Sequence, residues 1–156
     1  NLTILTAYFL SEGCYTEKSP NPKITNQDVS VIELLEQVIM LEFGQEQCKR
    51  YLYKNGVIDL RLLDNARKFI QANFHKVKSK DKIIPDFIMG ANEDIKRIFV
   101  SCFFNAEGSF NNLVDNHHIE ISSASQNILR QIQAILIQDG KHAGISGKYN
   151  KKYCKN

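Results

Sequence analysis

The sequence predicts an α+β fold made of two pseudo-symmetric repeats, because one motif occurs twice in its 156 residues. Residues 8–15 (YFLSEGCY) reappear as residues 103–110 (FFNAEGSF), so that Glu12-Gly13 in the first copy matches Glu107-Gly108 in the second. Further along, apolar positions 32, 35 and 38 of one helical stretch match positions 129, 132 and 135 of another. The motifs are offset by 95 residues and the helical stretches by 97, which indicates a tandem repeat.

The first two elements of the first copy are a helix and a hairpin. Residues 2–11 form an apolar run of helix length without Gly or Pro, and the Glu-Gly pair that follows predicts a helix end and a turn. Residues 14–26 predict a hairpin whose loop lies at residues 19–22, because that segment contains two prolines.

The rest of the first copy has stronger local signals. Residues 28–43 carry apolar side chains at helical spacing and end at Gly44, which predicts a second helix. Residues 48–54 and 57–63 flank Asn55-Gly56, a strong hairpin signal. Residues 64–74 predict a short amphipathic helix that closes the copy, so the expected order is αββαββα.

A basic linker joins the two copies. Residues 75–82 are polar and mostly basic, and residues 83–89 form a short apolar plug. Asn92 is a good N-cap for a second long helix that we expect to reach Ala106. We therefore divide the chain into a first repeat with its linker, 1–82, and a second repeat, 83–156. The second repeat is expected to be truncated or degenerate, because its last strand and helix have no counterpart.

Composition excludes several classes of protein. Hydrophobic residues make up 43% and charged residues 24%, as in ordinary globular proteins, and the net charge of +3 is only mildly basic. No apolar run reaches the roughly 18 residues of a membrane span, and no leader is expected. The four cysteines form no CxxC pair, which favours reduced thiols in a cytosolic compartment over a zinc site.

The repeated helices carry the candidate chemistry. Each has small residues four positions apart, which lets two helix backbones approach closely: Ala7 with Ser11, and Cys102 with Ala106. If the helices pack along these faces, Glu12 and Glu107 reach the same end. Two converging carboxylates suit Mg²⁺, which prefers oxygen ligands and retains water and substrate phosphate. A pair of such metals could hydrolyse a phosphodiester.

Residues 5–13 (LTAYFLSEG) and 100–108 (VSCFFNAEG) resemble the two signature helices of the LAGLIDADG homing endonucleases. The predicted order of elements resembles that family over nearly the whole chain. The Ile-Pro-x-x-Ile plug at residues 84–88, with the second motif, resembles the archaeal and intein-associated branch. The nonapeptide alone is loose, so the repetition and the topology carry most of the specificity.

The resemblance implies paired LAGLIDADG helices beneath a saddle of two curved antiparallel sheets that sits over the major groove of double-stranded DNA. It implies a monomer that cuts both strands of a long asymmetric target, as in intron homing. Mg²⁺ would be the cofactor, Mn²⁺ a substitute, and Ca²⁺ would support binding without cleavage. Glu12 and Glu107 would be the catalytic metal ligands, supported by the backbone carbonyls of Ser11 and Ala106.

The resemblance also implies a Lys or Gln near the metals, in the second strand of each repeat. Here the first copy offers Asn26 and Gln27, with Lys23 nearby, whereas the second copy offers Ser123 and Ala124. No lysine occupies either position.

The DNA-reading surface can be argued from the strands themselves, because a two-stranded ribbon fits the major groove. On the hairpin with Asn55-Gly56, residues 58, 60 and 62 should face the core, leaving Asp59 and Arg61 outward. Basic residues at the end of the chain would contact phosphates. The predicted DNA contacts are Lys23, Asn26, Gln27, Lys49, Arg50, Tyr51, Arg61, Lys148, Lys151 and Lys152.

Two other functions remain open at this stage. The same fold could serve a non-cleaving DNA or RNA binder, such as an intron maturase that binds intron RNA or a transcriptional regulator. An unrelated repeat protein with two solvated glutamates is the second alternative. For the endonuclease we expect the cytoplasm of a prokaryotic or archaeal cell, or an organelle, and no secretion.

Overall fold

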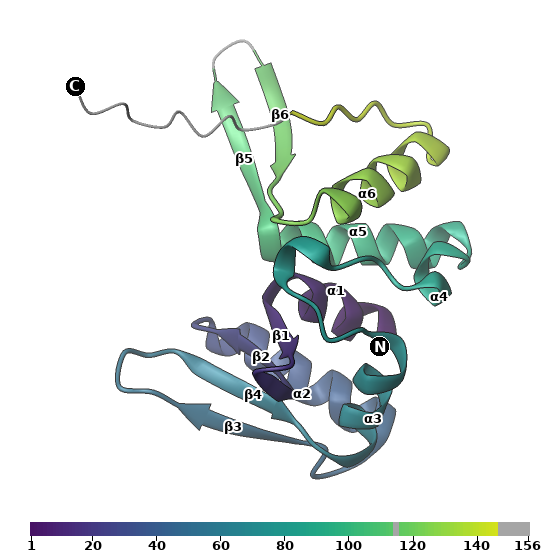
Figure 1. Cartoon of the computed structure of the whole chain (residues 1–156). Helices are drawn as coiled ribbons and strands as arrows, with labels where there is room; N and C mark the ends of the chain where they lie inside the picture. The colour runs from purple at the N-terminus through teal and green to yellow at the C-terminus, as the bar shows by residue number, and fades with distance from the viewer. Residues whose placement is uncertain (114–115, 147–156) are drawn as a thin grey trace, which may run out of the picture.

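A computed structural model describes residues 1–113 and 116–146 of the chain, shown in Figure 1. In the first half the elements are α1 (Leu2–Glu12), β1 (Gly13–Thr16), β2 (Ser19–Asn26), α2 (Val29–Phe43), β3 (Cys48–Leu52), β4 (Ile58–Leu62) and α3 (Asp64–Asn73). They are followed by a 3₁₀ turn η1 (Ser79–Asp81), α4 (Asp86–Met89), α5 (Glu93–Glu107), β5 (Gly108–Leu113), β6 (Asn116–Ile121) and α6 (Gln126–Gln138).

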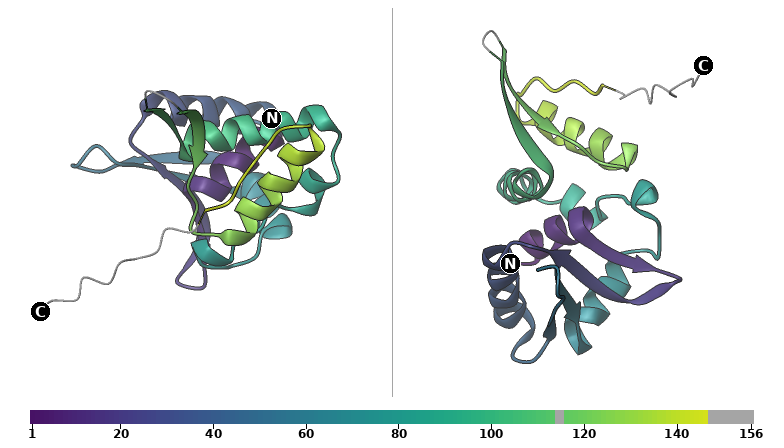
Figure 2. Two further views of the ribbon diagram at one scale, coloured as in Figure 1. Left: turned by 90° about the horizontal axis from the view of Figure 1, so that it is seen from above. Right: turned by 90° about the vertical axis from the view of Figure 1, so that its left-hand side faces the viewer.

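The order helix–strand–strand–helix occurs twice, which confirms the predicted α+β repeat. The first half forms a four-stranded antiparallel sheet in the order β1-β2-β4-β3, and the second half forms the two-stranded hairpin β5-β6. Helices α1 and α5 pack against each other, and the two sheets lie on opposite sides of this helix pair (Figure 2).

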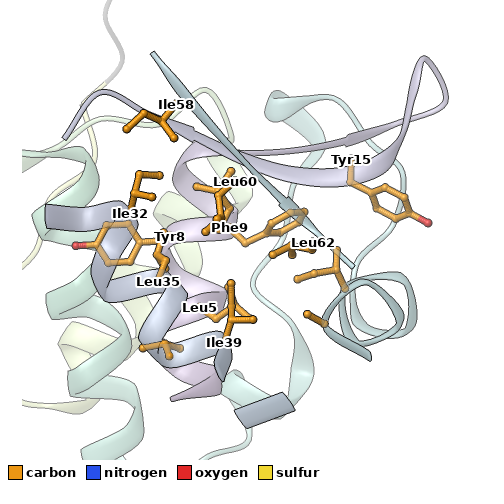
Figure 3. Packing of buried hydrophobic residues seen from close by; sticks show 14 residues of the cluster. Leu5, Tyr8, Phe9, Tyr15, Ile32, Leu35, Ile39, Ile58, Leu60 and Leu62 are labelled. Atoms are coloured by element: carbon orange, nitrogen blue, oxygen red, sulfur yellow. The ribbon is translucent and has the colours of Figure 1, made fainter. Parts of the chain in front are cut away.

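The first core lies between the four-stranded sheet and helices α1 and α2 (Figure 3). Alternate side chains of β4 face the helices, as a strand period of two requires: Ile58, Leu60 and Leu62. Helix α2 meets them with side chains at helical spacing, of which Ile32 and Leu35 are fully buried.

The helix pair connects this core to a second one. Ala7 and Leu10 of α1 pack into the second core, beside Phe99 and Phe103 of α5. In return, Cys102 of α5 is partly buried against both cores and Ala106 against the first. The small side chains therefore lie between the helices, where the sequence predicts a close approach.

The predicted loop at residues 19–22 is wrong. The turn lies at Glu17 and Lys18, and β2 already begins at Ser19. Pro20 and Pro22 lie outside the ladder with β4, which pairs only residues 23–26 of β2. On the other side, the ladder with β1 pairs Ser19 and Lys23 and changes register between them. Proline is tolerated there because neither proline is paired in a regular ladder.

The two halves differ beyond their shared elements. In the first half β4 lies beside β2, whereas in the described part of the second half β6 pairs only with β5. An open groove of about 1,420 Å³ lies between α5, β6 and α6, lined partly by Val100, Ile121 and Leu129. No described helix is long and apolar enough to cross a membrane.

Candidate functional site

Helices α1 and α5 run in the same direction, so β1 and β5 leave them at the same end (Figure 1). Glu12 is the last residue of α1 and Glu107 is the last residue of α5. The two carboxylates therefore lie at one end of the helix pair, at the junction of both sheets.

A glycine after each glutamate makes this junction possible. A Cβ on Gly13 would lie 2.3 Å from the carbonyl oxygen of Phe9, and one on Gly108 would lie 2.4 Å from that of Phe104. Both glycines have ordinary negative φ values, so a larger residue is excluded by the lack of space for its side chain and not by the backbone conformation. The expected turn after the helix is absent, because each glycine is already the first residue of a strand.

Glu12 is half-buried and held by a neighbouring strand. The Asn26 side-chain amide donates a hydrogen bond to Oε2 of Glu12 at 2.5 Å. Burial raises the pKa of the Glu12 carboxyl above its ordinary value, the Asn26 hydrogen bond opposes this shift, and the nearby charge of Asp28 adds to it.

Glu107 is electrostatically coupled to Glu12. Burial raises the pKa of the Glu107 carboxyl, the negative charge of Glu12 raises it further, and the positive charge of Lys82 opposes both. Two partly buried carboxylates that repel each other favour a cation between them. Their oxygens, with water, fit Mg²⁺. Residues 1–113 and 116–146 show no group of three or more His, Cys, Asp or Glu side chains suited to a metal.

The small residues before the glutamates have structural contacts. The Ser11 hydroxyl lies 3.2 Å from the carbonyl oxygen of Ala7 and 3.1 Å from that of Tyr8, within its own helix. Ala106 packs against the first core. Their side chains thus serve the helix pair, which leaves only their backbone carbonyls as candidate ligands.

Lys82 is a residue near the site that the sequence reasoning missed. Its Nζ donates to the carbonyl oxygens of Leu10 at 2.9 Å and Gly13 at 2.7 Å, on either side of Glu12. Burial lowers its pKa, whereas the nearby Cys14 and Glu107 raise it. The only sequence signal is its place directly before the apolar plug, since the linker contains other lysines.

The four-stranded sheet presents a row of cations on its outer face, away from the helices. Lys23 lies opposite Arg61, which lies opposite Lys49 on the next strand. The Tyr51 ring lies between two of them, 4.2 Å from the Arg61 guanidinium carbon and 5.4 Å from Nζ of Lys49. We call Lys23, Lys49, Tyr51 and Arg61 the outer row.

Asp59 lies on this outer face, as the strand alternation predicts, yet it is buried, with a relative exposure of 1%. Lys23 donates to its carboxylate at 2.6 Å, the Thr25 hydroxyl at 2.7 Å and the Tyr53 hydroxyl at 2.9 Å. These three side chains cover it, and Lys23 is consequently an ion-pair partner as well as a member of the outer row.

Arg50 does not share a face with the outer row. It lies opposite the fully buried Leu60, on the side of the sheet that carries the helices. There its guanidinium makes a two-pronged ion pair with Glu36 of α2, at 3.0 and 2.5 Å.

The other predicted DNA contacts fall in different places. Asn26 is held between Glu12 and the backbone N–H of Asp28. Gln27 is exposed just after β2. Lys148, Lys151 and Lys152 lie outside the described residues.

Comparison with known proteins finds one family model and several chains of known structure that match. Residues 94–156 match a family model described as a LAGLIDADG-like domain. Six chains of known structure match, among them a variant of I-DmoI in complex with its target DNA and in the presence of manganese. The two chains are 12% identical, and the match spans 88% of this chain and 74% of the I-DmoI chain, with a TM-score of 0.55. At this identity the likeness shows the fold. No curated protein matches the chain.

Proposed function

We propose that this chain, which has the fold of the LAGLIDADG homing endonucleases, is a site-specific DNA endonuclease that hydrolyses both strands of a long asymmetric duplex. The observation that carries the proposal is the meeting of Glu12 and Glu107 at one end of the paired helices. Neither carboxylate is taken up by an ion pair among the described residues.

Divalent metal is the cofactor that fits this end of the helix pair. Glu12 and Glu107 would hold it through carboxylate oxygens, with the backbone carbonyls of Ser11 and Ala106 as supporting ligands. Bound there, Mg²⁺ would lower the pKa of a water molecule and stabilise the leaving oxygen of a phosphodiester. We propose Mg²⁺ as the physiological ion, Mn²⁺ as a substitute, and Ca²⁺ as an ion that supports binding alone.

The outer row supports a duplex partner. A sheet face with three basic side chains and one aromatic ring can follow the major groove, where alternate residues reach bases and phosphates. Two unequal halves suit an asymmetric target, because each half can contact its own half-site. We propose that the protein acts as a monomer, in a prokaryotic or archaeal cytoplasm or in an organelle.

A duplex selection tests the proposal. The chain is incubated with a random pool of duplex DNA in Ca²⁺, and the recovered DNA is transferred to Mg²⁺. We expect a consensus that is then cut on both strands with a fixed stagger. If no duplex is enriched, the endonuclease assignment fails.

The variant Glu12→Gln separates chemistry from binding, because it removes the charge but keeps the size of the side chain. We expect it to lower the cleavage rate at least about 1,000-fold, a magnitude typical of essential catalytic groups. Its affinity for the selected duplex in Ca²⁺ should stay within about threefold, because the outer row is unchanged. Cleavage assays and binding titrations give both values, with the exposed Glu17→Gln as control.

A non-cleaving DNA or RNA binder is the second candidate, and one contact favours it. The family resemblance implies a Lys or Gln near the metals, in the second strand. In this chain the second strand instead supplies Asn26, whose side-chain amide donates to the Glu12 carboxylate. If the selected duplex is bound but remains intact in Mg²⁺ and Mn²⁺, this function replaces the endonuclease.

A further inference from the structure

Lys82 reaches from the linker into the end of α1. Its Nζ donates to the carbonyl oxygens of Leu10 and Gly13 and lies 3.4 Å from that of Phe9. These carbonyls belong to the last turn of the helix and to the residue that follows Glu12. The Phe9 carbonyl also accepts from the backbone N–H of Gly13. Because the last carbonyls of a helix have no partner within it, the ammonium group supplies a donor to that of Leu10.

The electrostatics of α1 explain why a cation is held at this position. The carbonyl end of a helix carries partial negative charge, which a basic side chain in the last turn usually offsets. Helix α1 has no basic residue in its last turn, and it ends in an acid. Among the described residues, the cation that contacts this end of α1 is Lys82, which lies 70 residues away from Glu12 in sequence.

The backbone of Lys82 is fixed on the opposite side, in the second half of the chain. Its carbonyl oxygen accepts a hydrogen bond of 2.6 Å from the Ser125 hydroxyl, which also caps α6 and is fully buried. Two residues later, the backbone N–H and carbonyl of Ile84 both bond to the side-chain amide of Gln131, at 2.8 and 3.1 Å.

We propose that Lys82 is a positioning residue of the cleavage centre. Anchored on α6 through its backbone, it holds the main chain on both sides of Glu12 and thereby fixes the Glu12 carboxylate relative to Glu107. This inference rests on the proposed endonuclease function.

The test compares Lys82→Met, which removes the charge and keeps the stem, with Lys82→Arg, which retains the charge and the donors. Lys80→Met is the matched control, because Lys80 is an exposed lysine of the same linker. Ca²⁺ affinity without DNA is measured by calorimetry, and single-turnover cleavage and duplex affinity are measured on the selected target.

For Lys82→Met we expect single-turnover cleavage to fall about 100-fold, because small misplacements of a catalytic group have effects of that size. Ca²⁺ affinity should fall about tenfold, as for other residues that orient metal ligands. Duplex affinity should change less than about threefold, since the side chains of the outer row are unaltered. Lys82→Arg should recover cleavage to within about tenfold of the unmodified chain, because it keeps a positive charge and N–H donors at the carbonyl end of α1.

Three results would overturn the proposal. The first is that Lys82→Met cleaves as fast as the unmodified chain, and the second is that it binds Ca²⁺ more tightly. The third is that both Lys82 variants lose stability and duplex affinity to the same extent. Thermal unfolding identifies the last case. The proposed function is tested separately. If it is wrong, the unmodified chain itself does not cleave the selected duplex, and this is known before any variant is compared.

Discussion

At the scale of single residues, Asp59 shows how a sheet surface can carry a buried charge. It is the only Asp, Glu, Lys or Arg side chain among the described residues that is buried. Burial alone would raise the pKa of its carboxyl, but the hydrogen bonds from Lys23, Thr25 and Tyr53 outweigh burial and lower the pKa below its ordinary value.

This lowered pKa predicts a stability that depends on pH. A carboxyl with a lower pKa in the folded state stabilises the fold above its unfolded pKa, and the contribution is lost as pH falls through the folded pKa. We expect Asp59→Asn to reduce the free energy of unfolding by about 2 kcal/mol at pH 7, the cost of disrupting a buried charged hydrogen-bond group. The difference should shrink toward pH 2.

Urea unfolding of both proteins between pH 7 and pH 2 measures this difference. Asp81→Asn is the control, because Asp81 is exposed in the linker. A deficit for Asp59→Asn that does not change with pH would contradict the assigned role of the carboxylate.

Single residues also mark the limit of prediction from sequence. Glu12 and Glu107 could be selected because the internal repeat duplicates them, and the structure places them at one end of the helix pair. Lys82 could not, because its contacts with Leu10 and Gly13 depend on how the linker crosses α1. Apart from its place directly before the apolar plug, no local pattern distinguishes it from Lys78 or Lys80.

At the scale of elements, the junctions between helix and strand impose the tightest steric condition. Phe9 and Phe104 bring both a carbonyl oxygen and a ring against the following glycine. Because the contact includes backbone, a methyl group cannot be accommodated by rotating a side chain.

Gly13→Ala and Gly108→Ala should therefore each lower the free energy of unfolding by about 1–3 kcal/mol, as overpacking does. Gly144→Ala is the matched control, since a Cβ there meets nothing within 4 Å. Thermal and urea unfolding compare the three variants. Equal stability of Gly13→Ala and Gly144→Ala would show that the junction has room to adjust.

Elements defined by local patterns were predictable and those set by their neighbours were not. Helix α2 and the hairpin β3-β4 follow from apolar spacing, Gly44 and Asn55-Gly56, and all are found where expected. The start of β2 is not predictable from the sequence, because Pro20 and Pro22 indicate a loop. The strand contains them because that end of β2 is not paired with β4. Lys49 and Arg50 are both predicted DNA contacts, but adjacent strand residues face opposite sides of the sheet, so only Lys49 lies on the outer face.

At the scale of the whole molecule, the outer row predicts how salt affects binding. Each phosphate neutralised on duplex DNA contributes about 0.9 to the slope of log affinity against log salt concentration. Arg61→Ala should weaken binding to the selected duplex and reduce this slope by about 0.9. Arg50→Ala removes an equal charge from the opposite face, where Glu36 neutralises it, and should leave the slope unchanged.

Binding titrations over a range of salt concentrations compare Arg61→Ala and Arg50→Ala with the unmodified chain. Equal slopes for the two variants would mean that the outer face is not the surface that contacts phosphate.

The exchange of side chains across the helix pair has a consequence for recombination between proteins of this architecture. Ala7 and Leu10 of the first half complete the core of the second, and Cys102 and Ala106 of the second half pack against the core of the first. A chimera that takes its halves from two parents therefore inherits two hybrid interiors. Its parents must match at the helix faces before differences in the strands that we propose contact DNA can be combined, so the helix pair limits which of those strands can be exchanged.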